Sequence, residues 1–132
     1  MESLSLTQME NLAIEPSKFS PQIDFDSTTG VLKITGASFM EHPLEFYAPV
    51  LLWLDQFSKI PHSQSTLKVH LSYFNSGSSG IIFDILQLLD NKAATSPVMV
   101  EWHVDPNDEE MLAEGEEFKD CFEKLEFNII QN

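Results

Sequence analysis

The chain has 132 residues, a length that suits one domain with one core, and its 42% hydrophobic content, with ten Phe and two Trp, is enough to fill that core. Its 21 acidic residues face only seven lysines and no arginine, and the formal net charge of −14 disfavours nucleic acid and anionic membranes as partners. A single cysteine, Cys121, excludes an intramolecular disulfide and a cysteine-based zinc cluster. Because the chain shows neither a long apolar run nor a signal-peptide pattern at its start, we expect a cytoplasmic protein.

The first predicted elements are a β-hairpin and a helix. We expect residues 1–11 to form a loosely ordered arm of the single domain, residues 1–132. The runs 22–26 and 31–35 flank a Ser-Thr-Thr-Gly turn, which is typical of a hairpin. Pro43 suits the first turn of a helix that ends before Pro61 and covers one face of a sheet. Its apolar positions are Phe46, Val50, Trp53, Leu54 and Phe57.

The second half of the chain alternates strands and helices. We expect a strand over residues 67–74, a helix from about 78 to 91, a strand over 98–104, an acidic helix from Asp108 and a short strand over 127–130. Both Trp53 and Trp102 fall at inward positions. The order β-β-α-β-α-β-α-β predicts an α/β fold, with one mixed β-sheet and its helices mainly on one face.

The turn between the strand over 67–74 and the next helix is the most informative segment. Before the turn, alternate residues of the strand, among them Leu71 and Tyr73, are apolar and are expected on its buried face. The period of the apolar residues then changes from 2 to 3.6, and Asn75, Ser76 and Ser78 are all good N-cap residues. A hydroxyl at a helix start lies where the helix dipole and free N–H groups favour negative charge. The sequence therefore predicts that a phosphate on Ser76 or Ser78 would be well accommodated, although the same residues could merely cap a helix.

Catalysis by this turn is disfavoured by its spacing. A nucleophile elbow requires G-x-S-x-G, but Gly77 and Gly80 are only three residues apart. A P-loop requires Gly-Lys followed by Ser or Thr, and Gly80 is followed by Ile81. We therefore expect no catalytic residues, no enzyme activity and no cofactor.

The C-terminal region concentrates the negative charge. Residues 101–126 contain eleven acids and two lysines, so they carry −9 of the −14. This pattern is typical of a solvated helix face, and it also suits docking of a basic partner. His103 and Asp105, with acids nearby, suggest a metal site, but no third ligand has a fixed spacing, so we expect no metal.

Several blocks of the sequence, in order, resemble the SiaC family of bacterial regulatory phosphoproteins, whose fold is similar to STAS domains and anti-sigma factor antagonists. The segment Tyr73-Phe74-Asn75-Ser76 with Ser78 and Asp84-Ile85-Leu86 resembles the family's Y-x-N-T-S-S…D-I-L core. Residues 36–41 with Phe46, Tyr47 and Trp53 resemble the entry into its first helix. Residues 101–118 resemble its W-x-x-D motif and the acidic stretch that follows.

This resemblance implies a STAS-like fold and a non-enzymatic signalling switch. A Ser/Thr kinase of the anti-sigma factor kinase type and a PP2C-type phosphatase would act on it. The unphosphorylated form would bind a diguanylate cyclase (a GGDEF protein) and promote cyclic-di-GMP signalling and biofilm formation. The phosphoacceptor position falls on Ser76, where the family usually has Thr, with Ser78 as the alternative; Gly77 replaces a Ser and Gly80 a common Lys. The expected partner-binding residues are Asn75, Ser76, Gly77, Ser78 and Ser79.

Two other function classes remain compatible with the sequence. Related switch modules engage anti-sigma factors, so the protein could be an anti-sigma factor antagonist in a partner-switching system. A STAS-like domain can also bind a small ligand in its groove.

Overall fold

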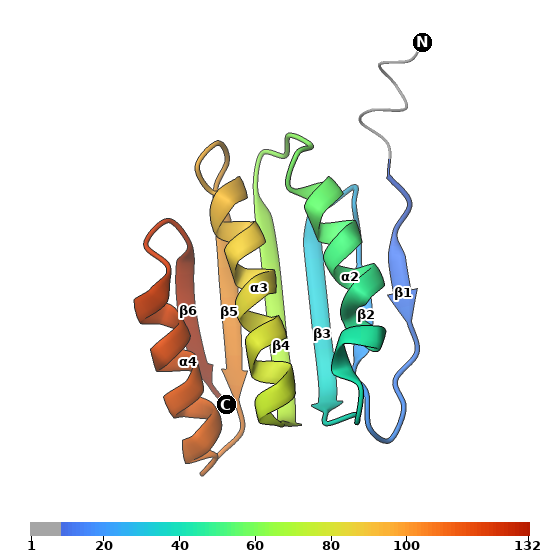
Figure 1. The fold of residues 1–132 in the computed structure, drawn as a ribbon. Coiled ribbons are helices and arrows are strands. Elements are labelled where there is room, and N and C mark those ends of the chain that lie inside the picture. Colours follow the sequence, from blue (N-terminus) through green and yellow to red (C-terminus); the bar gives the residue numbers. More distant parts are fainter. Residues whose placement is uncertain (1–8) are drawn as a thin grey trace.

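Residues 9–132 of the chain, except for the side chain of Ser76, are described by a computed structural model (Figure 1). They form one six-stranded sheet with the strands in chain order, β1-β2-β3-β4-β5-β6. The strands are β1 (Leu12–Ile14), β2 (Gln22–Phe25), β3 (Val31–Ser38), β4 (Ser65–Phe74), β5 (Val98–Val104) and β6 (Glu126–Gln131). The helices are α2 (Pro43–Phe57), α3 (Ser76–Lys92) and α4 (Glu109–Cys121).

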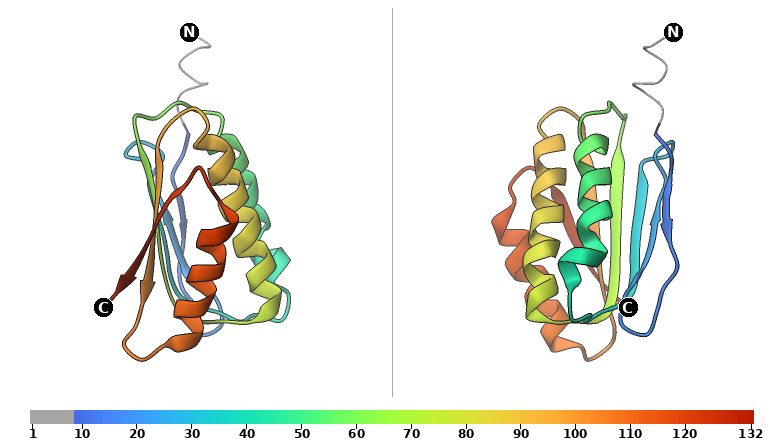
Figure 2. Two further views of the ribbon diagram at one scale, coloured as in Figure 1. Left: turned by 90° about the vertical axis from the view of Figure 1, so that its left-hand side faces the viewer. Right: turned by 45° about the vertical axis from the view of Figure 1, so that its right-hand side comes forward.

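The sheet is mixed. Strands β1, β2 and β3 pair antiparallel, whereas β3, β4, β5 and β6 pair parallel, each joined to the next by one helix. Since such crossover connections are right-handed, all three helices lie on the same face of the sheet, as Figure 2 shows. The predicted α/β fold, hairpin included, is confirmed.

The core lies between the sheet and the helices. It is lined by alternate residues of the strands, among them Leu67, Val69, Val100 and Trp102, and by one side of each helix. Trp102 is buried as predicted, but Trp53 is only half-buried, because its indole reaches the sheet margin and its Nε1 donates to the backbone oxygen of Glu10 at 2.8 Å.

The expected loosely ordered arm, residues 1–11, falls largely outside the described residues, which begin at Met9. The next residues are tied to the fold, because the Ser27 Oγ donates to the Met9 oxygen at 2.6 Å and the Ser27 N–H donates to the Asn11 side chain at 2.9 Å. The chain then forms β1, a strand that the sequence analysis did not predict.

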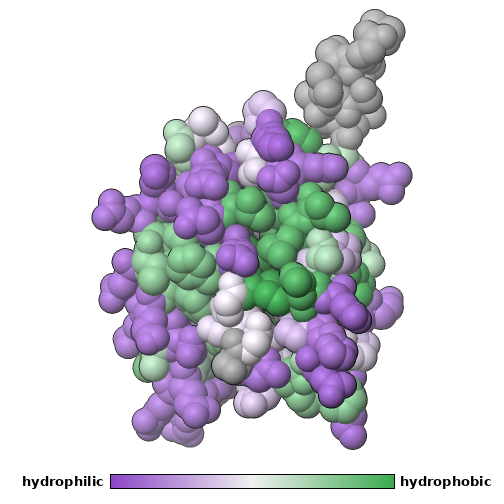
Figure 3. All heavy atoms as spheres, viewed as in Figure 1, coloured by the Kyte–Doolittle hydropathy of each residue, from purple (hydrophilic) through white to green (hydrophobic). Residues whose placement is uncertain are grey.

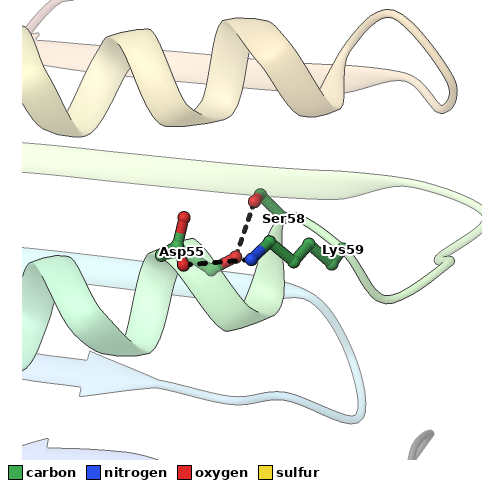
Figure 4. A network of polar contacts seen from close by, with 3 residues as sticks. All are labelled: Asp55, Ser58 and Lys59. Carbon is green, nitrogen blue, oxygen red and sulfur yellow. Dashed lines mark hydrogen bonds and ion pairs between the residues drawn. The ribbon is translucent and has the colours of Figure 1, made fainter.

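Polar contacts hold the C-terminal end of α2. The Ser58 hydroxyl donates to the Asp55 backbone oxygen at 2.7 Å, and the Lys59 Nζ lies 3.3 Å from the Asp55 carboxylate (Figure 4). Lys92, at the end of α3, is buried there; its Nζ donates to the backbone oxygens of Phe57 and Ile60. This buried lysine joins the ends of α2 and α3, and burial lowers its pKa.

A β-bulge changes the alternation at the end of β4. Gly36 of β3 pairs with Leu71, but the next residue, Ala37, pairs with Tyr73, so Ser72 is an extra residue. Tyr73 is therefore 51% exposed, although the period of two predicted it to lie inward, while Phe74 turns toward Trp102. The bulge lies immediately before the turn into α3.

Candidate functional site

The turn between β4 and α3 is held by Asn75, the N-cap of α3. Its side-chain oxygen accepts a hydrogen bond from the Ser78 N–H at 3.1 Å, and its own N–H donates to the Ser38 oxygen at 3.1 Å. The helix begins at Ser76, two residues before the predicted start. Of the three cap residues predicted, Asn75 is the one that serves, and Ser76 is the first residue of the helix.

Ser78 lies inside the molecule and not on its surface. Its side chain has 0% exposure; its Oγ donates to the Ser38 backbone oxygen at 3.2 Å and lies 2.8 Å from the Ser38 Oγ. The Ser38 Oγ lies in turn 2.8 Å from the Tyr47 hydroxyl. Burial raises the pKa of Tyr47 to about 12, against a smaller opposing effect of the Ser38 hydrogen bond. This hydroxyl cluster ties the turn to β3 and α2.

The other predicted partner-binding residues are more accessible. Gly77 is exposed, and Asn75 and Ser79 are half-buried. The side chain of Ser76 lies outside the described part of the structure, so its predicted role stays a prediction. A Cβ on Gly77 would lie 3.3 Å from the Pro43 side chain, which places the start of α2 against the start of α3.

Two grooves flank the turn. One, with a volume of about 490 Å³, lies between the turn and the start of α4; we call it the acidic groove and define it by Tyr73, Phe74, Asp108, Glu110 and Glu114. The other, of about 550 Å³, lies toward α2; we call it the apolar groove and define it by Phe19, Phe39, Met40 and Pro43. Asn75 lines both grooves.

Two histidines of the sheet, His70 and His103, pair with carboxylates. On the helix-free face of the sheet, His70 Nε2 lies 2.7 Å from Asp105, and His103 Nε2 lies 3.1 Å from Glu101. Among residues 9–132, no group of three or more His, Cys, Asp or Glu side chains is placed to hold a metal ion. No helix in that part of the chain is long and apolar enough to cross a membrane.

A model of the SiaC family, described as regulatory phosphoproteins, matches residues 14–132. The chain belongs to the SiaC family. A relative from Pseudomonas aeruginosa strain UCBPP-PA14, an uncharacterized protein, is 31% identical over 115 residues, which cover 86% of this chain and 91% of the relative.

Solved structures from the same family have the same fold. The chain superposes on SiaC of Pseudomonas aeruginosa with a TM-score of 0.85 and 29% identity, covering 94% of this chain and all of that one. A second match, with a TM-score of 0.85 and 29% identity over 92% of this chain and 99% of the other, is SiaC bound to the diguanylate cyclase SiaD, whose activator it is. The sequence resemblance to the family is thereby confirmed.

Sequence reasoning did not identify every residue that shapes this SiaC-family site. Ser38, Tyr47 and the aromatic residues of the apolar groove come from segments distant from the turn. Ser38 and Tyr47 fall within the blocks that resemble the family, and this was the available signal. The contact of Ser38 with Ser78 depends on the pairing of β3 with β4, which the local pattern does not encode.

Proposed function

We propose that this protein is a non-enzymatic switch that binds and activates a diguanylate cyclase when it is unphosphorylated, and so promotes cyclic-di-GMP signalling and biofilm formation. The observation that carries the proposal is its likeness to SiaC as bound to the cyclase that it activates, along 92% of the chain. Because its kinase would use ATP and its cyclase GTP, the proposal places the protein in the cytoplasm.

We assign the regulated hydroxyl to Ser76. A phosphate on the first residue of α3 would lie at the positive end of the helix dipole and would add about −1.5 to −2 charges to the surface. Ser78 is a poor acceptor in this fold, since a kinase cannot reach a hydroxyl with 0% exposure that is engaged by Ser38. Burial also separates the predicted partner-binding residues. Asn75, Gly77 and Ser79 are available for contact with a partner, whereas the Ser78 side chain is not.

The proposed cycle needs two enzymes that act on this turn. A Ser/Thr kinase of the anti-sigma factor kinase type would phosphorylate Ser76, and a PP2C-type phosphatase would restore the free hydroxyl. Addition of phosphate would change charge and shape at the docking surface, while the hydroxyl cluster of Ser38, Tyr47 and Ser78 would still tie the turn to β3 and α2.

The test combines phosphate mapping with a cyclase assay. The protein is incubated with its kinase and ATP, the phosphate is located by intact-mass and peptide mass spectrometry, and each form is added to diguanylate cyclases of the same organism while cyclic-di-GMP is measured. We expect the parent and Ser76→Ala to activate one cyclase, and the phosphorylated parent to lose this effect.

Ser78→Ala is the matched control. It should still be phosphorylated, because its acceptor remains, whereas Ser76→Ala should not be. Phosphate that persists in Ser76→Ala and disappears in Ser78→Ala would show that Ser78, and not Ser76, is the phosphoacceptor. No stimulation of any cyclase by the unphosphorylated protein would contradict the proposed function.

A further inference from the structure

The acidic groove has the composition of a site for a cationic side chain. Its wall carries the carboxylates of Asp108, Glu110 and Glu114, and its lining includes no Lys or His. Asp108 accepts a hydrogen bond from the Met111 N–H, which fixes it at the start of α4. Among residues 9–132, neither Glu110 nor Glu114 forms an ion pair. Burial, and secondly the charge of Glu117, raise the pKa of Glu114, an effect that a bound cation would reverse.

Aromatic side chains make arginine the best occupant of this groove. Tyr73 and Phe74 line it beside the carboxylates. A guanidinium can bind carboxylates through its fork of N–H donors while its planar face lies on an aromatic ring, which an ammonium group does less well.

The apolar groove on the other side of the turn suits a large apolar side chain. Phe19 is 49% exposed and packs edge-to-face on Phe39 with 5.1 Å between ring centroids. Phe39 packs on Tyr73 in the same way at 5.4 Å. These three rings form a continuous line from the apolar groove to the acidic groove. An exposed aromatic cluster of this kind is typical of a binding surface.

The two grooves are close enough to be used together, because Asn75 lines both and Tyr73 connects them. We propose that the output partner binds with a single segment that crosses the turn, placing an arginine in the acidic groove and a large apolar side chain in the apolar groove. This inference rests on the proposed function, since it names the chemistry that the cyclase must present. The net charge of −14 favours a basic segment as the occupant.

The crossing segment also gives a reason for release on phosphorylation. Residue 76 lies between Asn75, which lines both grooves, and Gly77, which lines the apolar groove. Because residue 76 is bonded to both of these lining residues, a phosphate on it would add bulk and negative charge close to the crossing segment. The negative charge of the phosphate by itself attracts cations, but its bulk displaces the segment, so the arginine no longer lies over the carboxylates.

The first test compares matched pairs of variants in binding to the cyclase that the parent activates. Glu110→Gln with Glu114→Gln removes two charges from the acidic groove. The control, Glu116→Gln with Glu123→Gln, removes two charges from exposed positions in and just after α4 that do not line the groove. Phe19→Ala opens the apolar groove. Leu52→Ala is its control, because it truncates another exposed apolar residue, in α2, the helix over which apolar residues gather in Figure 3.

Each groove variant should weaken binding by about tenfold or more, whereas each control changes it less than about twofold. Binding by the acidic-groove variant should also depend less on salt. Equal loss in the groove and control charge variants would overturn the inference, and so would full binding by Phe19→Ala. If the parent binds no cyclase, the proposed function fails. If the parent binds a cyclase and the groove variants bind it as well as the controls do, only the inference fails, so the two failures are distinguishable.

The second test identifies the occupant directly. Tyr73→p-benzoylphenylalanine places a photocrosslinker on the surface between the grooves, and Leu52→p-benzoylphenylalanine is the control. We expect the group at position 73 to capture a cyclase peptide with an arginine next to a large apolar residue. Capture of a peptide without arginine, or the same peptide from both positions, would overturn the inference.

Discussion

Gly115 in α4 provides a sharp test of the packing around Trp102. A Cβ at this position would lie 2.4 Å from Cδ1 and 2.6 Å from Nε1 of the indole, so either the helix or the ring must shift. The ring has no free space, since it is fully buried against Phe118 and Phe127, and its Nε1 donates to the Met111 backbone oxygen at 2.9 Å.

The expected effect of Gly115→Ala follows from three terms. Overpacking costs ~1–3 kcal/mol. Displacing the indole weakens a buried hydrogen bond worth ~1 kcal/mol. Against these, alanine is favoured over glycine in a helix by ~1 kcal/mol. The free energy of unfolding should therefore fall by about 1–3 kcal/mol, and the melting temperature by roughly 3–10 °C for a domain of this size.

Gly80→Ala is the matched control, measured by the same thermal and urea unfolding. Nothing lies within 4 Å of a Cβ at Gly80 in α3, so only the helix term acts, and stability should rise by ~1 kcal/mol. The reasoning is refuted if Gly115→Ala melts at or above the temperature of the parent.

Three further predictions concern the core and the hydroxyl cluster. Trp102→Ala should lower the free energy of unfolding by ~3–5 kcal/mol, as measured in urea; a variant with the stability of the parent would show that the indole is not a core residue. The raised pKa of Tyr47 contributes stability that is fully present below pH 10 and is lost as the pH rises through about 12, so Tyr47→Phe should flatten this part of a curve of unfolding free energy against pH; an unchanged slope between pH 10 and 12 would contradict it. Ser78→Ala should cost ~1 kcal/mol through the lost contacts with Ser38, and a melting temperature equal to that of the parent would argue against the cluster.

The elements that the sequence predicts well are those with strong local signals. The hairpin has its turn residues, α2 has Pro43 in its first turn, and α4 has the capping Asp108 and an acidic first turn. Asn75 caps α3 with its side chain, as its residue type indicates. In each of these cases a short stretch of chain determines its own structure.

The features that the sequence does not predict depend on contacts between distant segments. The extra residue in β4 exists only in relation to β3, and it alone moves Tyr73 from the predicted inward side to the surface. Strand β1 has three residues, too few for a clear alternation, and it is defined by pairing with β2. The burial of Ser78 arises in the same way, from the Ser38 hydroxyl forty positions earlier. The residues of the turn were therefore predicted, but not the grooves beside it.

The buried Lys92 bears on how the two central helices can move. Its Nζ donates to the carbonyl oxygens at the end of α2, so the two helices are fastened together at the end remote from the turn. A tilt of α3 relative to α2 would therefore pivot about Lys92. Since 17 residues of helix span about 25 Å, a tilt of ~5° about Lys92 would move the start of α3 by about 2 Å. The hydrogen bonds of Ser78 with Ser38, and of Ser38 with Tyr47, oppose that tilt, because they tie the start of α3 to β3 and α2.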